Sequence, residues 1–349
     1  MSVDEQTVTL ALAGAPEASA TDQADAARRW ALIAFGYYFA LVAIAIEWMD
    51  VVVPNRISVT FFGHAVSIGN IHDHILKAGL LGFAIVPAAF LVELLVVGWP
   101  ESSLRHLLFA RSPSSRSDLV SFILWQSHAM NVIRVILTLG TALISGYWIH
   151  GWIQLQTGID LGLNGAPGPV AFVGYLAIFT FTDYWTHRLD HSRIFWPTHR
   201  YHHSAEDFFI ITSNRGNPGA FTGIVANSLP LGILGMPAAT GFWIYILVAT
   251  QHLIIHSRIN SDFGWFGRYV LQSPAHHRLH HTIETSRPTA HFSLLPLWDH
   301  LFGTWQAERR IGNCPRIRIG VAQPYRHGLW ILSDVWRDYR EFLGGLLRR

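Results

Sequence analysis

The sequence predicts an all-α, polytopic membrane protein with a histidine-rich helical cap, and two features of its composition support this. Lys, Arg, Asp and Glu make up only 14% of the 349 residues, whereas hydrophobic residues make up 50%. Soluble domains carry about 25% charged residues, so the deficit is typical of several membrane spans. The second feature is histidine: there are 20, and thirteen of them lie between His187 and His300.

Four long apolar segments and one interrupted segment predict about four transmembrane helices and a helical hairpin. A span needs about 20 mostly apolar residues, and the segments that meet this are 30–53, 79–99, 119–149 and 170–185. The stretch 220–250 is also apolar, but Pro230, Gly232, Gly235 and Pro237 interrupt it near its middle. Because such residues break helices, we expect two half-length helices that return the chain to the side it left.

The arginines of the short loops predict the orientation, because Lys and Arg gather on the cytoplasmic side. Arg28 and Arg29 precede the first span, and the loops after spans two and four are also rich in Arg. The loops on the opposite side carry only Arg56 and Lys77. The amino terminus and every histidine cluster are therefore expected to be cytoplasmic.

These features divide the chain into four regions. Residues 1–28 are polar and lack the basic start of a signal peptide, so we expect a disordered tail. Residues 29–169 carry spans one to three, 170–305 form the histidine-rich catalytic region, and 306–349 form a C-terminal segment. The end of the C-terminal segment, 330–349, is expected to be an amphipathic helix. This helix either contacts the membrane surface or a partner protein, or it caps the fold.

Ten histidines recur at helical spacing and predict a metal site. They form four clusters with offsets of three or four residues: His187 and His191; His199, His202 and His203; His252 and His256; His277, His280 and His281. Such offsets place side chains on one face of a helix, so we expect each cluster to point its rings in one direction. One structural ion needs about four ligands, so ten imidazoles suit two ions; their spacing leaves Fe, Zn, Cu and Ni open.

Further polar residues near these clusters are candidate outer partners of the ligands. Ligating histidines usually donate their second ring N–H to a carboxylate or a carbonyl, and the candidates are Asp183, Asp190, Glu284, Asp299 and His276. No catalytic residue is predicted beyond the metal ligands. Three histidines stay open: His128, inside the third span, as an outer partner or a packed polar residue; His291, as a further ligand or part of a pocket-shaping loop; and His300, as an outer partner or a surface residue.

Three stretches of residues resemble the fatty acid hydroxylase/sterol desaturase superfamily of membrane di-iron oxygenases. They are Asp183-Tyr-Trp-Thr-His187 through His203-Ser204, Ser273-Pro-Ala-His276 through His281, and Leu297-Trp-Asp299-His300-Leu-Phe-Gly303-Thr304. The stretch from Gln251 to His256 is similar to the family's intermediate histidine element. The resemblance implies that all ten clustered histidines bind two iron ions, with O2 as co-substrate. It also implies hydroxylation, desaturation or ether oxidation of a fatty acyl, sterol or related lipid.

The partners follow from what the sequence contains and lacks. The substrate would come from the bilayer. There is no glycine-rich dinucleotide fingerprint, and the single cysteine, Cys314, cannot hold an iron–sulfur cluster. Electrons must therefore come from a separate ferredoxin, cytochrome or reductase. A net charge of +2 gives no indication of a nucleic-acid partner.

Non-enzymatic alternatives remain at this stage. A membrane haem protein would carry single histidines on facing helices inside the bilayer, and a metal carrier would carry ligands along a path through it. Only Glu93, His128 and Arg134 are candidates for such positions. Hydrolysis at a di-zinc site is a third alternative, which lacks an obvious bridging carboxylate among the clusters. Neither the lipid nor the oxidised carbon can be read from the sequence.

Overall fold

The structure is a computed structural model that describes residues 20–61, 64–109, 112–127, 129–130, 141–163, 165–216, 221–283, 289–306, 317–323, 325–328 and 331–347. The first half contains α2 (Ala20–Val52), β1 (Arg56–Phe61), β2 (His64–Gly69), α3 (Ile71–Ala78), η1 (Gly79–Ile85), α4 (Val86–Val97), η2 (Trp99–Glu101), α5 (Ser103–Phe109) and α6 (Pro113–Gln126). The second half contains α8 (Thr141–Thr157), α9 (Gly168–Asp190), α10 (Trp196–His203), η3 (Ile210–Asn214), α11 (Phe221–Ile233), α12 (Ala238–Ile255), α13 (Gly264–Tyr269), α14 (Pro274–His280), α15 (Pro296–Leu301) and α16 (Ile331–Leu347).

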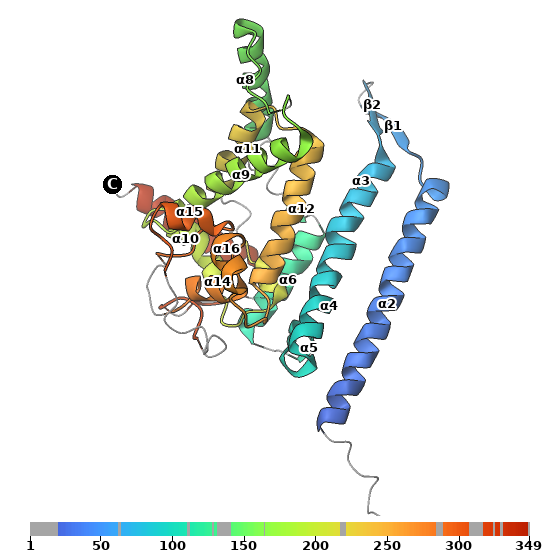
Figure 1. Ribbon diagram of the computed structural model, residues 1–349, viewed down its shortest axis with the longest axis vertical. Coiled ribbons are helices and arrows are strands. Elements are labelled where there is room, and N and C mark those ends of the chain that lie inside the picture. The colour runs from blue at the N-terminus through green and yellow to red at the C-terminus, as the bar shows by residue number, and fades with distance from the viewer. Residues whose placement is uncertain are drawn as a thin grey trace, which may run out of the picture.

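Figure 1 shows the long helices α2 and α4 side by side, with α10, α14, α15 and α16 gathered beside α12. The expected all-helical architecture is confirmed, with one addition. Strands β1 and β2 form an antiparallel hairpin whose register pairs Arg56 with Gly69 and Phe61 with His64. The alternation of polar and apolar residues in Arg56–Phe61 is the sequence signal for this hairpin.

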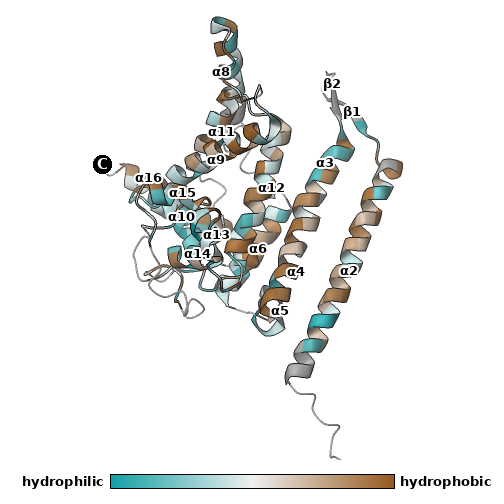
Figure 2. Cartoon of the chain, viewed as in Figure 1, coloured by the Kyte–Doolittle hydropathy of each residue, from teal (hydrophilic) through white to brown (hydrophobic). Residues whose placement is uncertain are grey.

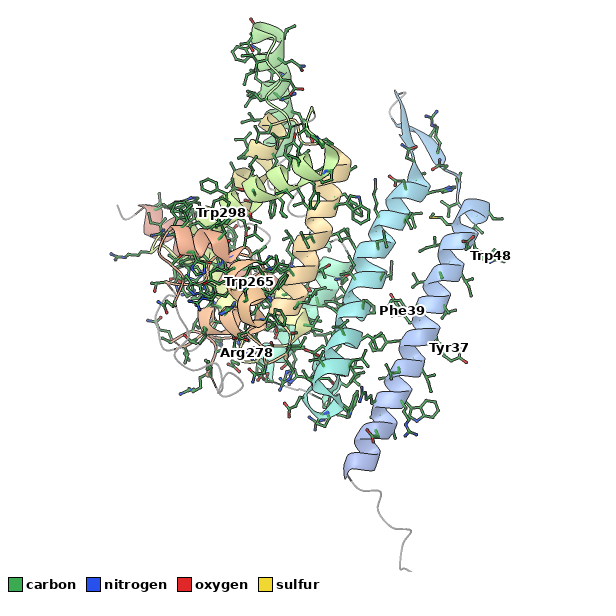
Figure 3. All side chains as sticks on the ribbon, in the orientation of Figure 1. Tyr37, Phe39, Trp48, Trp265, Arg278 and Trp298 are labelled. Atoms are coloured by element: carbon green, nitrogen blue, oxygen red, sulfur yellow. The ribbon has the colours of Figure 1, made fainter. Side chains whose placement is uncertain are left out.

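Three helices of the described chain are long and apolar enough to cross a membrane: Asp25–Met49, Ile71–Val97 and Ala238–Ile255. Figure 2 shows apolar residues along the length of α2, α4 and α12. In Figure 3, Tyr37 and Trp48 point away from the rest of the molecule, and their side chains are 72% and 63% exposed. Such large exposed apolar side chains need a nonpolar environment, so the chain is an integral membrane protein.

The expected spans are found in part. The first two correspond to α2 and to the continuous α3, η1 and α4, although α2 already begins at Ala20, within the stretch expected to be a disordered tail. Residues 1–19 and the middle of the expected third span, 131–140, lie outside the described residues. Helix α9 has 23 residues, but the fourth expected span within it is not among the three apolar helices. Its second half carries Thr180, Thr182 and Asp183, which lower its hydropathy.

The interrupted apolar stretch forms a hairpin of α11 and α12, with the turn at residues 234–237. Pro230 lies inside α11 and Pro237 is the N-cap of α12, while Gly235 takes the positive φ of 59° that the turn requires. The second arm is longer than expected: α12 has 18 residues and is itself one of the three candidate spans. The hairpin returns the chain to the side on which α9 ends, because α9 and α12 both end where the clustered histidines meet.

A buried glutamate joins the end of α4 to the end of α12. Glu93 is 1% exposed, and its carboxylate accepts hydrogen bonds from the backbone N–H of Ser103 and of Arg258, both at 2.6 Å. These bonds satisfy a carboxylate that would otherwise be costly to bury. Glu93 therefore has a structural role, and it places the end of α4 on the same side of the molecule as the histidine clusters.

Helices α8 and α11 approach closely enough for backbone contact at Gly146. A Cβ atom there would lie 2.6 Å from the Leu229 carbonyl oxygen and 2.8 Å from the Gly232 Cα. We expect Gly146→Ala to lower the free energy of unfolding by about 1–3 kcal/mol, because the backbones would have to separate. Thermal unfolding in detergent measures this. Gly151→Ala, on the same helix with nothing within 4 Å of the added methyl, is the control, and equal destabilisation by both would contradict the prediction.

Candidate metal centre

The clustered histidines come from four helices whose ends converge. Histidine is the C-cap of three of them: His191 for α9, His256 for α12 and His281 for α14. Proline at the first turn of α10 and α14 fixes where these short helices begin, and the Ser273 side chain caps α14 by accepting the His276 N–H at 3.2 Å. The local sequence therefore fixes the start of each short helix and hence the direction of its rings.

Nine of the ten clustered histidines form two groups. The first group is His187, His191, His199, His203 and His280; the second group is His202, His256, His277 and His281. Within each group one nitrogen from every ring lies within 4.8 Å of all the others. The groups adjoin, because the rings of His203 and His281 are stacked with their centroids 4.1 Å apart.

Each triplet divides between the two groups, which corrects the expectation that every cluster points in one direction. On α10 the i, i+4 pair His199 and His203 belongs to the first group, and His202 belongs to the second. Helix α14 has the opposite arrangement, since His277 and His281 belong to the second group and His280 to the first. The two copies of His-x-x-His-His thus each contribute to both groups.

The tenth histidine, His252, lies next to the second group but is not part of it. Its ring is nearly parallel to that of His256, with centroids 6.2 Å apart. Its backbone carbonyl accepts a hydrogen bond from His256 Nδ1 at 2.8 Å. His252 therefore supports a member of the second group through its backbone, and its own role as a ligand stays a prediction.

Distances between ring nitrogens fit two metal ions. The Nε2 atoms of His280 and His187 are 3.1 Å apart in the first group, and those of His277 and His256 are 3.1 Å apart in the second. Two nitrogens bound at right angles to one ion, each about 2.1 Å from it, are about 3 Å apart. In the first group, both ring nitrogens of His191 and His203 are buried without a hydrogen-bond partner among the described residues. A bound cation would satisfy one nitrogen of each of these rings.

The rings are in the protonation state that metal binding requires. Burial, and then the neighbouring imidazoles, hold the pKa of His199, His203 and His281 well below its usual value. Burial likewise lowers the pKa of His202 to about 3. All four rings are therefore neutral at pH 7 and can offer a lone pair to a metal.

Backbone carbonyls, rather than carboxylates, orient three of the clustered rings. His187 and His280 donate their Nδ1–H to the carbonyls of Phe292 and Ala290, both at 2.7 Å. His202 donates to the Arg215 carbonyl at 3.1 Å. Sequence reasoning missed these acceptors because every residue has a carbonyl, so residue type carries no signal for them.

The carboxylates proposed as direct acceptors have other partners. Asp183 accepts a hydrogen bond from Asn227 Nδ2 at 3.3 Å, which joins α9 to α11. Asp299 accepts backbone N–H groups of Phe292 and Ser293. Only Asp190 approaches a clustered ring, with Oδ2 4.0 Å from His199 Nδ1. Glu284 and His128 lie outside the described residues.

Three further histidines surround Trp305, away from both groups. The ring centroids of His276, His291 and His300 lie 4.5, 4.7 and 4.6 Å from that of Trp305. His300 also contacts the Arg268 carbonyl through Nε2 at 2.9 Å, and His276 contacts the Ser273 hydroxyl at 2.7 Å. None of the three belongs to either group among the described residues, and the two roles of His291, as a further ligand or as part of a pocket-shaping loop, stay predictions.

His291 has a positive φ of 59°, between the two residues whose carbonyls orient His280 and His187. We expect His291→Gly to retain both metals, because glycine adopts this conformation freely. His291→Val should weaken metal binding by about 10-fold or more, since a β-branched residue is strained there and displaces the carbonyls. Metal content after dialysis against a chelator measures both. Loss of a metal from His291→Gly would instead identify His291 as a ligand.

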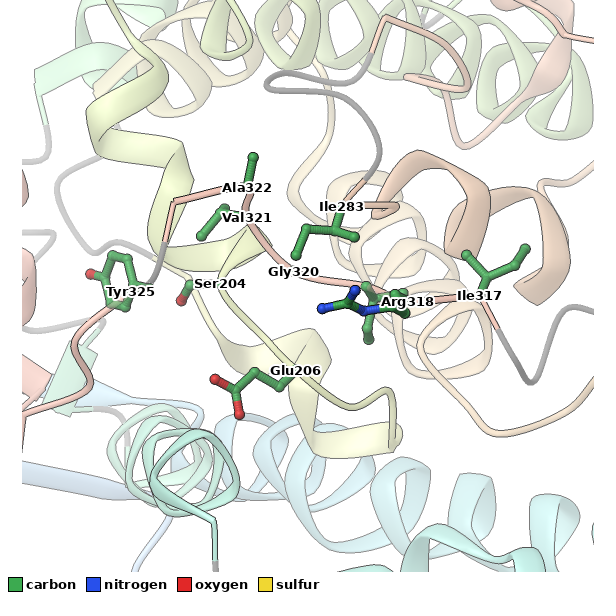
Figure 4. A pocket seen from close by; sticks show the side chains of 10 residues that line it. Ser204, Glu206, Ile283, Ile317, Arg318, Gly320, Val321, Ala322 and Tyr325 are labelled. Carbon is green, nitrogen blue, oxygen red and sulfur yellow. The ribbon is translucent and has the colours of Figure 1, made fainter.

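A surface cavity of about 520 Å³ opens where α10 ends, beside the site (Figure 4). Ser204, Glu206 and Arg318 line it together with Ile283, Ile317 and Ile319. No clustered ring lines this cavity, so it does not give access to the two groups. The rings are instead covered by aromatic side chains: Phe208 is stacked on His256 at 5.1 Å, and Phe292 lies 5.1 Å from His191.

The histidine-rich part of the chain is similar in sequence to known proteins. Residues 172–304 match the model of the fatty acid hydroxylase family. Alkylglycerol monooxygenase of Homo sapiens is 30% identical over 163 residues, which is 46% of this chain and 36% of that protein. The enzymes of the same name from Danio rerio and Xenopus tropicalis are 31% and 29% identical, over 45% and 41% of this chain and 34% and 31% of theirs. The chain thus spans about a third of the length of these relatives. No solved structure matches it.

Proposed function

Because residues 172–304 match the fatty acid hydroxylase family, we propose that this chain is a membrane-bound di-iron monooxygenase of lipids. The observation that carries this is the pair of adjoining groups, which offer nine imidazole nitrogens and no sulfur. Imidazole suits iron, and two ions in contact with a membrane bundle suit the oxidation of an alkyl chain. In the overall reaction a lipid C–H bond, O2, two electrons and two protons give a C–OH group and water.

The chain's own residues position, shield and support this chemistry. The ten histidines would hold two iron ions, which supply the O2-dependent redox chemistry that side chains lack. Backbone carbonyls fix the rings of His187, His202 and His280. Phe208 and Phe292, 5% and 4% exposed, cover the groups and exclude water from them.

The substrate class we propose is an alkylglycerol or a related ether lipid. Its support is that alkylglycerol monooxygenases are among the similar proteins, and that an ether-linked carbon fits the same C–H oxidation. A hydroxylated ether carbon is a hemiacetal, which releases an aldehyde and the free glycerol hydroxyl. Hydroxylation or desaturation of a fatty acyl chain is the other outcome of the test.

The electron donor and the orientation are also part of the proposal. We propose a separate ferredoxin, cytochrome or reductase as donor, and a cytoplasmic amino terminus and histidine site. The arginine distribution supports this orientation. So does the Glu93 contact, which places the end of α4 and the end of α12 on one side.

The test is turnover of the purified, iron-loaded protein in lipid nanodiscs with isotopically labelled O2 and a reconstituted ferredoxin and reductase. We expect donor-dependent release of aldehyde carrying the label from an alkylglycerol, and none after iron removal by a chelator. Label in a fatty acid product would support the oxygenase but not the ether substrate. A fully iron-loaded protein that is reduced and still incorporates no label into either lipid would overturn the proposal. A Soret band would identify a haem protein instead.

A further inference from the structure

One loop, residues 289–295, orients histidines from two different helices. The Ala290 carbonyl accepts from His280 on α14, and the Phe292 carbonyl accepts from His187 on α9, each at 2.7 Å. Both of these rings belong to the first group, and their Nε2 atoms are 3.1 Å apart. The position of two nitrogens of the first group therefore depends on the backbone of a single loop.

A carboxylate holds this loop in place from behind. Asp299 of α15 is 1% exposed. Its Oδ1 accepts the Phe292 N–H at 2.9 Å and the Thr304 hydroxyl at 2.7 Å, while its Oδ2 accepts the Ser293 N–H at 2.9 Å. Two consecutive backbone amides bound to the two oxygens of one buried carboxylate fix the peptide planes of the loop. Hydrogen bonds of this kind to a charged acceptor are stronger than those between neutral groups.

The second group does not use this loop. His202 donates to the Arg215 carbonyl and His256 to the His252 carbonyl, at 3.1 and 2.8 Å. Arg215 follows η3, and His252 belongs to α12. Among the described residues, Asp299 has no hydrogen bond to either of them. The rings of the two groups thus have different hydrogen-bond acceptors, and the loop hydrogen-bonds to α12 only at the Leu294 carbonyl, among the described residues, where it accepts from Gln251 Nε2 at 2.8 Å.

We infer that Asp299 is a positioning residue for one metal only: through loop 289–295 it sets the affinity of the first group and leaves the second group unchanged. This rests on the proposed function only in that the two groups bind metal, and it does not depend on the reaction. Outer partners of ligating histidines change metal affinity by about 10–100-fold. Since Asp299 acts on two rings at once, its removal should have an effect of that size on the first metal.

The test is competitive metal titration of the purified full-length protein against a chromophoric chelator, with Fe²⁺ under anaerobic conditions. For Asp299→Asn we expect one ion to bind with the affinity of the unchanged protein and the other about 10–100-fold more weakly, because an amide offers one oxygen to two N–H donors. Asp299→Glu, which keeps both oxygens, should recover part of the loss. Equal weakening of both ions, or of neither, would overturn the inference.

Two matched backgrounds identify the affected group, and a third variant controls for folding. In the His256→Ala background the remaining ion is held by the first group, so adding Asp299→Asn should release that ion. In the His280→Ala background the remaining ion is held by the second group, so adding Asp299→Asn should leave its affinity unchanged. The reverse pattern would contradict the inference. Asp334 is also 1% exposed and accepts a backbone N–H, from Gly328 at 2.9 Å, so Asp334→Asn tests general destabilisation and should retain both ions. If the unchanged protein binds two ions but oxidises no lipid, the proposed function fails and this inference stands.

Discussion

His280→Ala is expected to remove one of the two metal ions and at least about 100-fold of the lipid oxidation rate. The His280 side chain is the contribution of α14 to the first group, with Nε2 3.1 Å from that of His187. Alanine removes the nitrogen next to that of His187 and opens the first group towards α14, so the four remaining histidines no longer surround the ion. Metal analysis and product formation in nanodiscs measure the two effects on the same sample.

His300→Ala is the matched control for this variant. His300 is also a histidine of the cap, but it lies on Trp305 and the Arg268 carbonyl, outside both groups. We expect this variant to retain both ions and nearly full turnover. The assignment of His280 as a ligand would fail if His280→Ala kept two ions and full activity.

The second large effect concerns Arg215→Met, which we expect to destabilise the protein by about 3–5 kcal/mol. Arg215 is fully buried, and its Nε lies 3.2 Å from Oδ1 of Asp118, which is 1% exposed. It also donates to the hydroxyl and carbonyl of Ser114, at 3.2 Å each. Without the guanidinium the Asp118 carboxylate is buried with no compensating charge. Thermal unfolding in detergent, monitored by tryptophan fluorescence, measures the loss.

Two further variants separate this cause from others. Asp118→Asn together with Arg215→Met should recover much of the stability, since the unpaired charge is gone. Arg258→Met is the control for loss of an exposed ion pair: Arg258 lies 3.5 Å from Glu101, which is 70% exposed, and such pairs contribute about 0–1 kcal/mol. An equal loss of stability in Arg215→Met and Arg258→Met would contradict the prediction, because the buried ion pair would then contribute no more than the exposed one. Because the Arg215 carbonyl orients His202, weaker metal binding by the second group is a further expected result.

The sequence predicts the local features of this fold well. Apolar length locates α2 and the α3–α4 segment, and the Pro and Gly residues within an apolar stretch locate the α11–α12 hairpin, because each signal depends on a run of neighbouring residues. Spacing of three and four residues likewise identifies the histidines that gather in two groups. What spacing cannot predict is the division of each triplet, because it depends on which helix opposes His202 or His280 in space.

The remaining differences have similar causes. Carboxylates were expected to orient the rings because their residue type is visible in a sequence, whereas the Phe292 and Ala290 carbonyls are not. Asp299, expected as an outer partner of the ligands, contacts the loop that orients His187 and His280 and not a ring. The β1–β2 hairpin was not predicted, because two strands of six residues each are a weak signal beside the long apolar stretch Ile71–Val97. The sequence likewise gave no signal of how His276, His291 and His300 surround Trp305, since each lies in a different segment.

The wide separation of the clustered histidines along the chain has a consequence for biogenesis. The first of the nine grouped residues is His187 on α9 and the last is His281 after α14, and both groups need α14. Because α14 is synthesised after α9 and α12, neither group has all its nitrogens until α14 has left the ribosome. The proposed metal binding would thus be a late step, after α12 has inserted, and would add to the folding free energy only at that step. Chains made under iron starvation should remain in the metal-free form and be degraded sooner than loaded ones.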